Sequence, residues 1–338
     1  MRFAYLPVNP PYPVMDARLI AELPEGAGWQ YEPKWDGFRC LAFRDADDIE
    51  LQAKSGKSLT RYFPEVVVML KSLSADRFVV DSELVIAVKK ELSFEQLQLR
   101  LHPAESRVRK LANEYPATMI LFDLLVDERG EPFVNEALQR RREQLELFHK
   151  KYAKGIDRLQ LSPATTDVKE ARAWFEAAGS ALDGIVAKRL DLEYRSGDRT
   201  GMVKYKNVRS VDCVVGGFRY LERQKLVGSL LLGLFEDGLL HHVGCTSSIS
   251  GNERKSLTRR LEALRQPPGF TGRSPGGPSR WSSERSGEWE PLKPELVVEV
   301  KYDHFSGGRF RHGTKFIRWR PDKAPSQCTF DQVKQKPG

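Results

Sequence analysis

The sequence pattern changes near residue 207, and this change limits what the chain can fold into. From about 28 to 206, short apolar stretches typical of strands alternate along the chain with stretches of helical periodicity. Beyond 207, five short strand-like stretches follow one another, namely "VDCVVGGFRY", "GSLLLGLFED", "LLHHVGCT", "ELVVEVKYDHF" and "KFIRWR". One helical pattern, near 251–265, interrupts them. We therefore predict two domains, 1–207 and 208–338, in an α+β protein whose second domain is a small Greek-key barrel of the OB type.

Several elements of the first domain can be placed individually. The stretches "FRCLAFRD" and "IELQAKS" predict a hairpin around "DADD". "YFPEVVVMLKSL" predicts a helix with a proline in its first turn, and "VKEARAWFEAAG" predicts a helix ended by Gly179. "NEALQRRREQLELFHKKY" is typical of an amphipathic helix with a basic face. Strands are expected at "RFVVDSELVIAV", "TMILFDLLVD", "DGIVAKRL" and "GMVKYKN".

Composition narrows the class of protein. The 338 residues carry a net charge of +8, which is compatible with nucleic-acid binding and equally with a basic enzyme. No apolar run reaches membrane-spanning length and the N-terminal stretch lacks signal-peptide character, so we expect a cytoplasmic protein. The four cysteines and six histidines form no zinc-ligand spacing, and we expect reduced thiols.

The segment 266–288 is rich in Pro, Gly, Ser and Arg and predicts a long mobile loop. A disordered insertion is favoured over an arm that touches DNA through its arginines, which are Arg273, Arg280 and Arg285. Whether these arginines contact DNA stays open.

The stretch "EPKWDGFRC" places Lys34 between a proline and a tryptophan, directly before an aspartate, a glycine and an arginine. Alone, it fits a surface charge beside a tight turn as well as it fits a nucleophile. A nucleophilic lysine must lose its proton, and nearby positive charge lowers the lysine pKa from its usual value of about 10.4. Lys188, Lys204 and Lys206 are candidate neighbours, and the last two share a face of one strand.

Carboxylates interrupt several apolar strands, at Asp81, Glu83, Asp123 and Asp183. A carboxylate inside an apolar strand costs several kcal/mol unless it is paired or binds a metal. One such residue is usually a structural acceptor, whereas several in a chain with strand lysines indicate a site for phosphate and Mg²⁺. No GxxxxGK[ST] motif offers another phosphate site.

Taken in order, these stretches resemble the motifs of the covalent nucleotidyltransferases, which include ATP-dependent DNA ligases, RNA ligases and capping guanylyltransferases. "EPKWDGFR" resembles KxDGxR, "AKSGKSLT" resembles SRNG, and "VVDSELV" resembles the DGE strand. "LFDLL", "LDGIVAKR", "MVKYK" and "RHGTKFIRWRPDK" resemble the later elements. Further stretches, such as "GSLLLGLFEDGLLHHVG", are similar to the bacterial ligase C group and the ligase domain of ligase D. The resemblance implies an ATP-grasp-like adenylation domain of antiparallel sheets and helices, followed by an OB-fold domain.

The resemblance also implies roles for individual residues around the nucleotide. Lys34 would attack the α-phosphate of ATP and hold AMP as a phosphoramidate. Glu32 would recognise the adenine amino group, and Phe122 would stack on the purine. Arg39 would contact the AMP ribose and the nick, and Asp36 would help to place the 3′-OH strand.

Phosphate and metal roles follow in the same way. Glu83 would hold the ribose and, with Asp183, a divalent metal, Mg²⁺ or Mn²⁺. The cations implied to neutralise the AMP phosphate are Lys188, Lys204 and Lys206. The OB-domain residues implied to orient pyrophosphate are Arg320, Asp322 and Lys323.

Three positions depart from the family pattern. Lys54 replaces the usual arginine of SRNG and loses bidentate phosphate binding, which weakens the grip on a 5′-phosphate. Asp183 replaces a glutamate and has a shorter reach. Near the C-terminus, residues 313–315 replace the usual proline and arginine.

The favoured reading is an ATP-dependent DNA ligase that seals nicks in duplex DNA, as a monomer, in bacterial DNA repair alongside small polymerases. We also expect it near the nucleoid. Only 33 residues precede Lys34, which leaves no room for an NAD-specific module or a helical DNA clasp, so ATP is favoured over NAD. An RNA ligase or capping enzyme, and a non-catalytic OB-type nucleic-acid-binding protein, are the alternatives.

Overall fold

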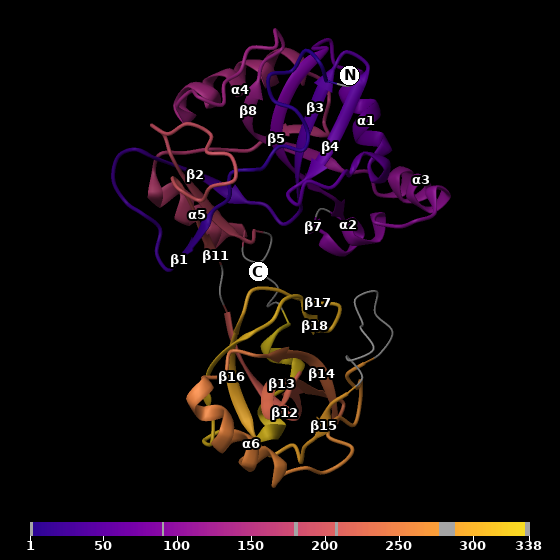
Figure 1. Cartoon of the computed structure of the whole chain (residues 1–338), viewed down its shortest axis with the longest axis vertical. Coiled ribbons are helices and arrows are strands. Elements are labelled where there is room, and N and C mark those ends of the chain that lie inside the picture. The colour runs from indigo at the N-terminus through magenta and orange to yellow at the C-terminus, as the bar shows by residue number, and fades with distance from the viewer. Residues whose placement is uncertain (1–2, 90, 179–181, 207–208, 277–287, 335–338) are drawn as a thin grey trace. The chain divides into compact units, whose positions relative to one another are not determined.

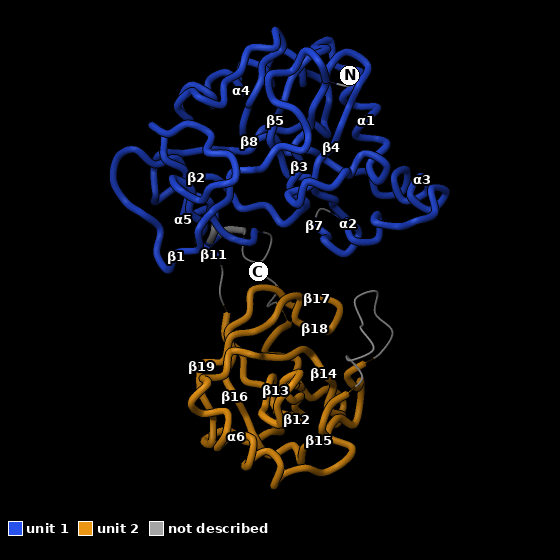
Figure 2. The backbone as a smooth tube through the Cα atoms, viewed as in Figure 1, with its two compact units in different colours: residues 1–206 blue, residues 207–338 orange. Residues whose placement is uncertain are grey.

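The computed structural model describes residues 3–89, 91–178, 182–206, 209–276 and 288–334. The chain divides into two compact units, Met1–Lys206 and Asn207–Gly338 (Figure 2). Residues 277–287 of the predicted loop 266–288 lie outside the described residues, as does Gly179, the predicted end of a helix.

The first unit is built on a five-stranded sheet (Figure 1). Its strand order is β4 (Asp48–Ala53), β3 (Phe38–Asp45), β5 (Arg77–Val85), β8 (Thr118–Val126) and β9 (Leu159–Leu161). The β8–β9 pair is parallel and the other pairs are antiparallel. The predicted hairpin "FRCLAFRD–IELQAKS" is confirmed as β3 and β4.

A four-stranded sheet lies in the same unit, in the order β1 (Arg18–Ile20), β11 (Met202–Lys206), β10 (Gly184–Arg189) and β2 (Trp29–Lys34). Two short strands, β6 (Ala87–Val88) and β7 (Glu91–Leu92), form a separate hairpin. The helices are α1 (Pro64–Lys71), α2 (Phe94–Arg100), α3 (Glu105–Glu114), α4 (Leu138–Tyr152) and α5 (Val168–Ala178), with a 3₁₀ turn η1 (Thr60–Tyr62). Helix α1 begins at the predicted proline, whereas α3 and the strands β1, β2, β7 and β9 were not predicted.

Both faces of the five-stranded sheet are buried, so its side chains alternate between two cores. Cys40 and Ala42 of β3 pack into the core shared with helices α1, α2 and α4. Leu41 and Phe43 point to the opposite face, where the N-terminal segment 3–17 covers the sheet. This covering segment was not predicted, because its apolar residues have neither helical nor strand period. The covering segment matters for the site because Asp16 lies near its end.

The second unit contains one long curved sheet in the order β14 (Leu239–Thr246), β13 (Gln224–Glu236), β12 (Arg209–Leu221), β16 (Val297–Tyr302) and β19 (Lys315–Trp319). These are the five predicted strands, and β15 (Glu290–Pro291) pairs with β12 at the side. The other elements are β17 (Phe305–Ser306), β18 (Arg309–Phe310), α6 (Arg254–Glu262), η2 (Gly251–Glu253), η4 (Pro325–Gln327) and η5 (Phe330–Gln332).

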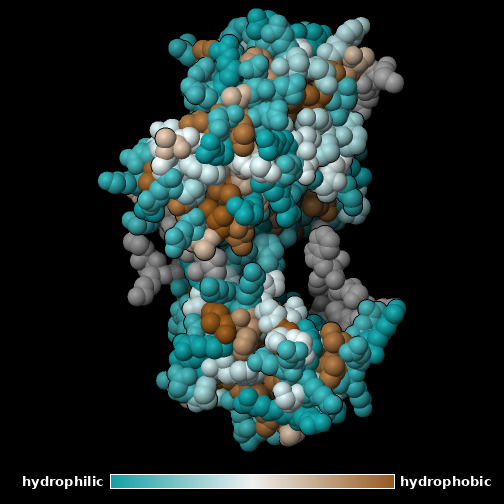
Figure 3. Space-filling view, turned by 60° about the vertical axis from the view of Figure 1, so that its left-hand side comes forward, coloured by the Kyte–Doolittle hydropathy of each residue, from teal (hydrophilic) through white to brown (hydrophobic). Residues whose placement is uncertain are grey.

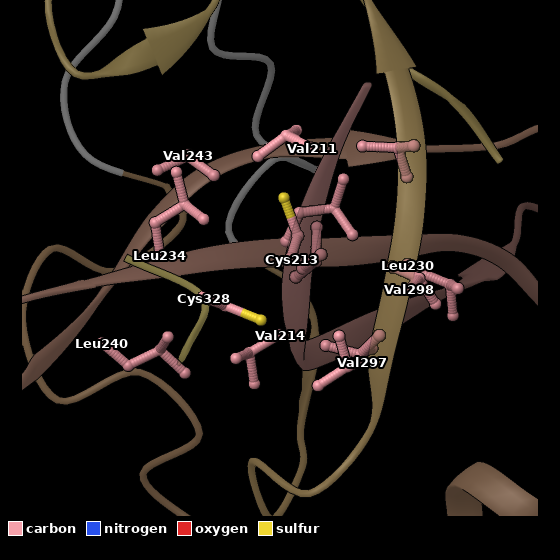
Figure 4. Close-up of a cluster of buried hydrophobic side chains, with 14 of the residues drawn as sticks. Val211, Cys213, Val214, Leu230, Leu234, Leu240, Val243, Val297, Val298 and Cys328 are labelled. Carbon is pink, nitrogen blue, oxygen red and sulfur yellow. The ribbon is translucent and has the colours of Figure 1, made fainter. Parts of the chain in front are cut away.

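Among the described residues, one bridge joins the two edges of this sheet, between Thr246 at the end of β14 and Thr314, the residue before β19. The described residues therefore form an almost closed sheet rather than a barrel sealed by a full ladder, as suits the partly open OB-fold. Its interior is filled by apolar side chains from β12, β13, β14 and β16, with Cys213 and Cys328 among them (Figure 4). Burial raises the pKa of the Cys328 thiol to about 12, which keeps it protonated and unreactive.

In the described residues, no helix is long and apolar enough to cross a membrane. The face of the molecule in Figure 3 is largely hydrophilic, with apolar side chains in scattered patches.

Candidate active site

A cavity of about 710 Å³ opens in the first unit beside Lys34. Its wall takes residues from β2, β10 and β11 of the four-stranded sheet and from β3, β5 and β8 of the five-stranded sheet. Eight residues predicted from the sequence line it: Glu32, Lys34, Arg39, Lys54, Glu83, Phe122, Lys188 and Lys204. Asp36 lies in the turn that joins β2 to β3. The fold thus brings together side chains that are up to 172 positions apart, from Glu32 to Lys204.

Lys34 is the last residue of β2, and the pairing of β2 with β10 decides what it faces. In this ladder Lys34 is opposite Gly184, and the Asp183 amide donates a hydrogen bond to the Lys34 carbonyl oxygen at 3.0 Å. The Lys34 ammonium forms an ion pair with the Asp183 carboxylate, and Lys206 Nζ lies 3.4 Å from the same carboxylate. The sequence analysis predicted only cations around Lys34. The structure adds a buried carboxylate, that of Asp183, which pairs with both Lys34 and Lys206.

Glycine is needed at two positions around Lys34. At Gly184, whose φ is +149°, a Cβ atom would lie 2.0 Å from the Tyr205 carbonyl oxygen. At Gly37, a Cβ atom would lie 2.2 Å from the Leu84 carbonyl oxygen. Both distances are far inside van der Waals contact. The glycines of "KWDGFR" and "LDGIVAK" therefore allow the close backbone approach that sets the position of Lys34.

Repulsion among the lysines is evident at Lys204. Burial lowers its pKa, and the charges of Lys54, Lys34 and Lys206 add to the lowering, while Asp16 opposes it. This is the general effect of like charges that lie close together. The cluster therefore favours the binding of a negatively charged group in the cavity.

The two predicted adenine-binding residues, buried Glu32 and half-buried Phe122, both contact Lys188. Glu32 is 3% exposed, and Lys188 Nζ lies 2.8 Å from its carboxylate. Gln30 Nε2 also donates to Glu32 at 2.8 Å. The Lys188 ammonium lies 4.6 Å from the Phe122 ring centroid, a cation–π contact. Lys188 is thus held by Glu32 and Phe122.

Arg39 is held by a buried carboxylate. Its Nε and Nη2 atoms donate to Asp81 at 3.0 and 2.6 Å, and Asp81 is 0% exposed. The Tyr194 hydroxyl donates to the same carboxylate at 2.7 Å. The Arg39 guanidinium lies 5.3 Å from the Phe122 ring centroid. Sequence reasoning missed Tyr194, because a single tyrosine in an irregular segment gives no signal.

Asp123 also forms an ion pair with an arginine. Arg141 on α4 donates to it through Nε and Nη2, at 2.8 and 3.0 Å. Asp81 and Asp123 are therefore structural partners of arginines, and the cavity lining includes neither. Their interpretation as part of a phosphate and Mg²⁺ site was wrong. A buried carboxylate must be paired, and a sequence does not show whether its partner is a metal or an arginine.

Glu83 has a different environment, although it lies two residues from Asp81 on the same strand. Burial raises its pKa to about 7, while the charges of Lys34 and Arg39 oppose the shift. Among the described residues, there is no group of three or more His, Cys, Asp or Glu side chains that could hold a metal. Any metal at Glu83 and Asp183 would therefore need ligands from a bound phosphate or water.

The predicted pyrophosphate-binding residues belong to the second unit. Arg320 Nη1 lies 2.9 Å from Asp212, and Lys323 Nζ lies 2.6 Å from the same carboxylate. Asp322 also pairs with Arg320, at 2.8 Å. Asp212 was not predicted. It orders both cations of the "RWRPDK" segment from the start of β12.

Comparison with protein-family models gives two matches. The model described as "ATP dependent DNA ligase domain" matches residues 17–206, and "ATP dependent DNA ligase C terminal region" matches residues 223–323. The chain belongs to the ATP-dependent DNA ligases.

Several bacterial relatives are similar to this ligase over most of its length. DNA ligase C1 of Mycolicibacterium smegmatis is 45% identical over 97% of this chain and 95% of its own. DNA ligase C of Mycobacterium tuberculosis is 40% identical over 98% and 96%. The multifunctional non-homologous end joining DNA repair protein LigD of M. tuberculosis is 31% identical over 88% of this chain and 37% of its own. The predicted resemblance to ligase C and ligase D is confirmed.

A solved Lig E DNA ligase supports the fold. It covers 91% of this chain and all of its own, with 16% identity and a TM-score of 0.58. The predicted fold class, an adenylation domain followed by an OB-fold domain, is therefore confirmed for this ligase.

We expect Gly184→Ala to destabilise the first unit of this ligase by about 1–3 kcal/mol or more, because β10 and β11 must separate to admit the methyl group. Urea unfolding measures this loss. Gly155 is the control, since its φ is +80° but no atom lies within 4 Å of a Cβ placed there. Gly155→Ala reports only the cost of the backbone conformation, about 1–2 kcal/mol. Equal losses in the two variants would contradict the close-approach explanation.

The raised pKa of Glu83 predicts a pH-dependent loss of stability. Between its ordinary value of 4.5 and about 7, the folded state keeps a proton that the unfolded state releases. Stability from this group is thus full below pH 4.5 and is lost as pH rises to about 7. In metal-free buffer near pH 4.5, the free energy of unfolding of Glu83→Gln should equal that of the wild type. Between pH 4.5 and about 7 the variant should become progressively more stable than the wild type, and above pH 7 the difference should stay constant. Urea unfolding across this range tests it.

Glu105→Gln is the matched control for this titration, because Glu105 is 70% exposed on α3. Its stability relative to the wild type should stay nearly constant across the same pH range. A Glu83→Gln profile as flat as that of the control would show that the Glu83 carboxyl titrates normally.

Proposed function

We propose that Lys34 is the nucleophile through which this ligase stores AMP before transferring it to a DNA 5′-phosphate. One observation carries the proposal: the Lys34 ammonium lies in a cavity, paired with Asp183 and accompanied by Lys206. Phosphoryl transfer depends on in-line placement and charge neutralisation more than on acid–base groups. A lysine at the end of a rigid strand, among other cations, meets both needs.

The nucleotide-binding roles follow from the same cavity. Glu32 has the carboxylate that accepts from the adenine amino group, and Phe122 presents an aromatic face to the purine. Arg39, held by Asp81, contacts the ribose side of AMP. Asp36, in the turn after Lys34, helps to place the 3′-OH strand.

Lys204 and Lys206 neutralise the AMP phosphate, since Lys204 lines the cavity and Lys206 shares Asp183 with Lys34. Lys188 supports this region from its buried position on Glu32, and it reaches the phosphate only if that pair opens. Lys54 binds a phosphate as a point charge rather than as a bidentate partner. Arg320, Asp322 and Lys323 of the second unit orient the pyrophosphate leaving group.

Glu83 and Asp183 would hold a divalent metal, Mg²⁺ or Mn²⁺. The residues present fit such an ion, because Mg²⁺ is usually bound by one or two carboxylates together with substrate phosphates and water. When bound, it would supply positive charge to the phosphates of ATP. The Asp183 carboxylate is occupied by Lys34 and Lys206 in this structure, so metal binding requires one of these pairs to loosen.

We place the activity in bacterial DNA repair, acting on nicked duplex DNA. The related LigD protein is named for DNA repair and end joining, and the ligase C proteins are similar over nearly the whole chain. Cooperation with small repair polymerases, a monomeric state and a place near the nucleoid are part of the same proposal.

Lys34→Ala should abolish covalent labelling by α-labelled ATP with Mg²⁺ or Mn²⁺, because no other group replaces the amine. A denaturing gel reads the label. Lys151→Ala is the control, since Lys151 is 63% exposed on α4 and does not line the cavity. The protein is first treated with pyrophosphate, which removes any AMP already attached to it. Label that persists in Lys34→Ala would overturn the assignment of the nucleophile.

A further inference from the structure

Asp16 is an acidic residue at the centre of a basic cluster, and the roles proposed above make no use of it. Its carboxylate lies 2.8 Å from Lys54 Nζ, 3.4 Å from Arg199 Nη2 and 3.9 Å from Lys204 Nζ. Asp16, Lys54 and Lys204 all line the cavity that contains Lys34. Three cations thus converge on one carboxylate at the wall of a phosphate-transfer site.

Asp16 is held by backbone hydrogen bonds, whereas two of its cationic partners are largely exposed. Its amide donates to the Asp198 carbonyl oxygen at 2.8 Å, and its carboxylate accepts from the Ala17 amide at 2.8 Å. Asp16 is 17% exposed, whereas Lys54 and Arg199 are 53% and 71% exposed. Backbone hydrogen bonds therefore hold the Asp16 carboxylate in place, whereas the more exposed side chains of Lys54 and Arg199 have room to turn toward another anion.

The charge of Asp16 persists at neutral pH. Burial would raise its pKa, but the hydrogen bonds from Lys54 and Ala17 and the charges of Lys54 and Lys204 lower it to about 2. The three cations and one anion leave a net charge of +2 (3 − 1) in the cluster. The cluster therefore still attracts anions, but each arriving group must compete with a carboxylate already in place.

We propose that Asp16 occupies a binding site for a terminal phosphate group, formed by Lys54, Arg199 and Lys204, and makes this site selective for doubly charged phosphates. A terminal phosphate carries about −1.5 to −2 charges at neutral pH. It competes with a single carboxylate for the three cations better than a phosphodiester does, because a phosphodiester carries only one charge. Asp16 thus reduces the binding of these cations to the phosphodiesters of intact DNA, which greatly outnumber the phosphates at strand ends.

This inference rests on the proposed function, which places the cavity at the nick and at ATP. Two sources supply a terminal phosphate there, the 5′-phosphate of a nicked strand and the γ-phosphate of ATP. The cluster recognises their shared chemistry, and the experiment separates the two.

The test is Asp16→Asn in the full-length ligase. Its Kd for intact duplex, for a nick with a 5′-hydroxyl and for a nick with a 5′-phosphate is measured between about 50 and 200 mM salt. We expect the preference for the 5′-phosphate nick over intact duplex to fall roughly three- to tenfold, mainly through tighter binding of intact duplex. The slope of log K against log salt for intact duplex should steepen by about 0.9, as for one added phosphate contact.

Two matched variants control for net charge and for folding. Asp191→Asn makes the same charge change at a side chain that is 59% exposed and paired with Arg189, and it should keep the wild-type preference. Asp16→Glu keeps the charge at the same position and should also keep most of the preference. Loss of selectivity in Asp16→Glu or Asp191→Asn equal to that in Asp16→Asn would overturn the proposal.

The ATP source has its own readout. If Asp16→Asn leaves the DNA preference intact but lowers the KM for ATP in the labelling reaction, the site serves the γ-phosphate. If neither the DNA preference nor the KM changes, Asp16 has only a structural role and the proposal fails. The DNA-binding measurements do not need catalysis, so wild-type protein that forms no Lys34 adduct would refute the proposed function while Asp16 is still tested.

Discussion

The pairing of β2 with β10 is the constraint on which the active site depends. Because Lys34 is opposite Gly184 in this ladder, the neighbouring Asp183 is fixed beside the Lys34 side chain by backbone hydrogen bonds. A glycine at 184 then lets β11 approach closely enough for Lys206 to reach the same carboxylate. Residues far apart in sequence thus become one charged group through strand register, which a shift of one residue would destroy.

The cavity is organised as a set of ion pairs rather than as bare positive charge. Each pair joins a cation implied in nucleotide or DNA binding to a carboxylate: Lys34 with Asp183, Lys188 with Glu32, Arg39 with Asp81, and Lys54 with Asp16. Unpaired cations clustered in a partly buried wall would repel one another and destabilise the fold. The carboxylates remove that cost and hold the cations in place. Ligand binding then exchanges one anion for another, which favours ligands of higher charge.

Much of this could be predicted from the sequence, for reasons that differ between residues. The strands that carry Glu83 and Lys204 were predicted from their apolar patterns, whereas β2, which carries Lys34, was not. The cavity shared by these three residues follows from the resemblance to ligase motifs. The pairing of Asp81 with Arg39 and of Asp123 with Arg141 could not be predicted, because periodicity shows burial and not the identity of a partner. Register and side-chain contacts between distant segments are needed for that.

Asp16 shows why the unpredicted part can matter for function. It lies in the irregular segment 3–17, whose apolar residues cover one face of the five-stranded sheet without any helical or strand period. Packing of that segment, rather than a motif, brings the carboxylate to the cavity wall. A motif comparison weighs Lys54 against the arginine that it replaces and concludes only that phosphate binding is weakened. Lys54, which binds phosphate less tightly than an arginine would, is also more easily kept from phosphodiesters by the Asp16 carboxylate. The lysine at position 54 and Asp16 thus form one arrangement in which affinity for phosphate is lower and selectivity is higher.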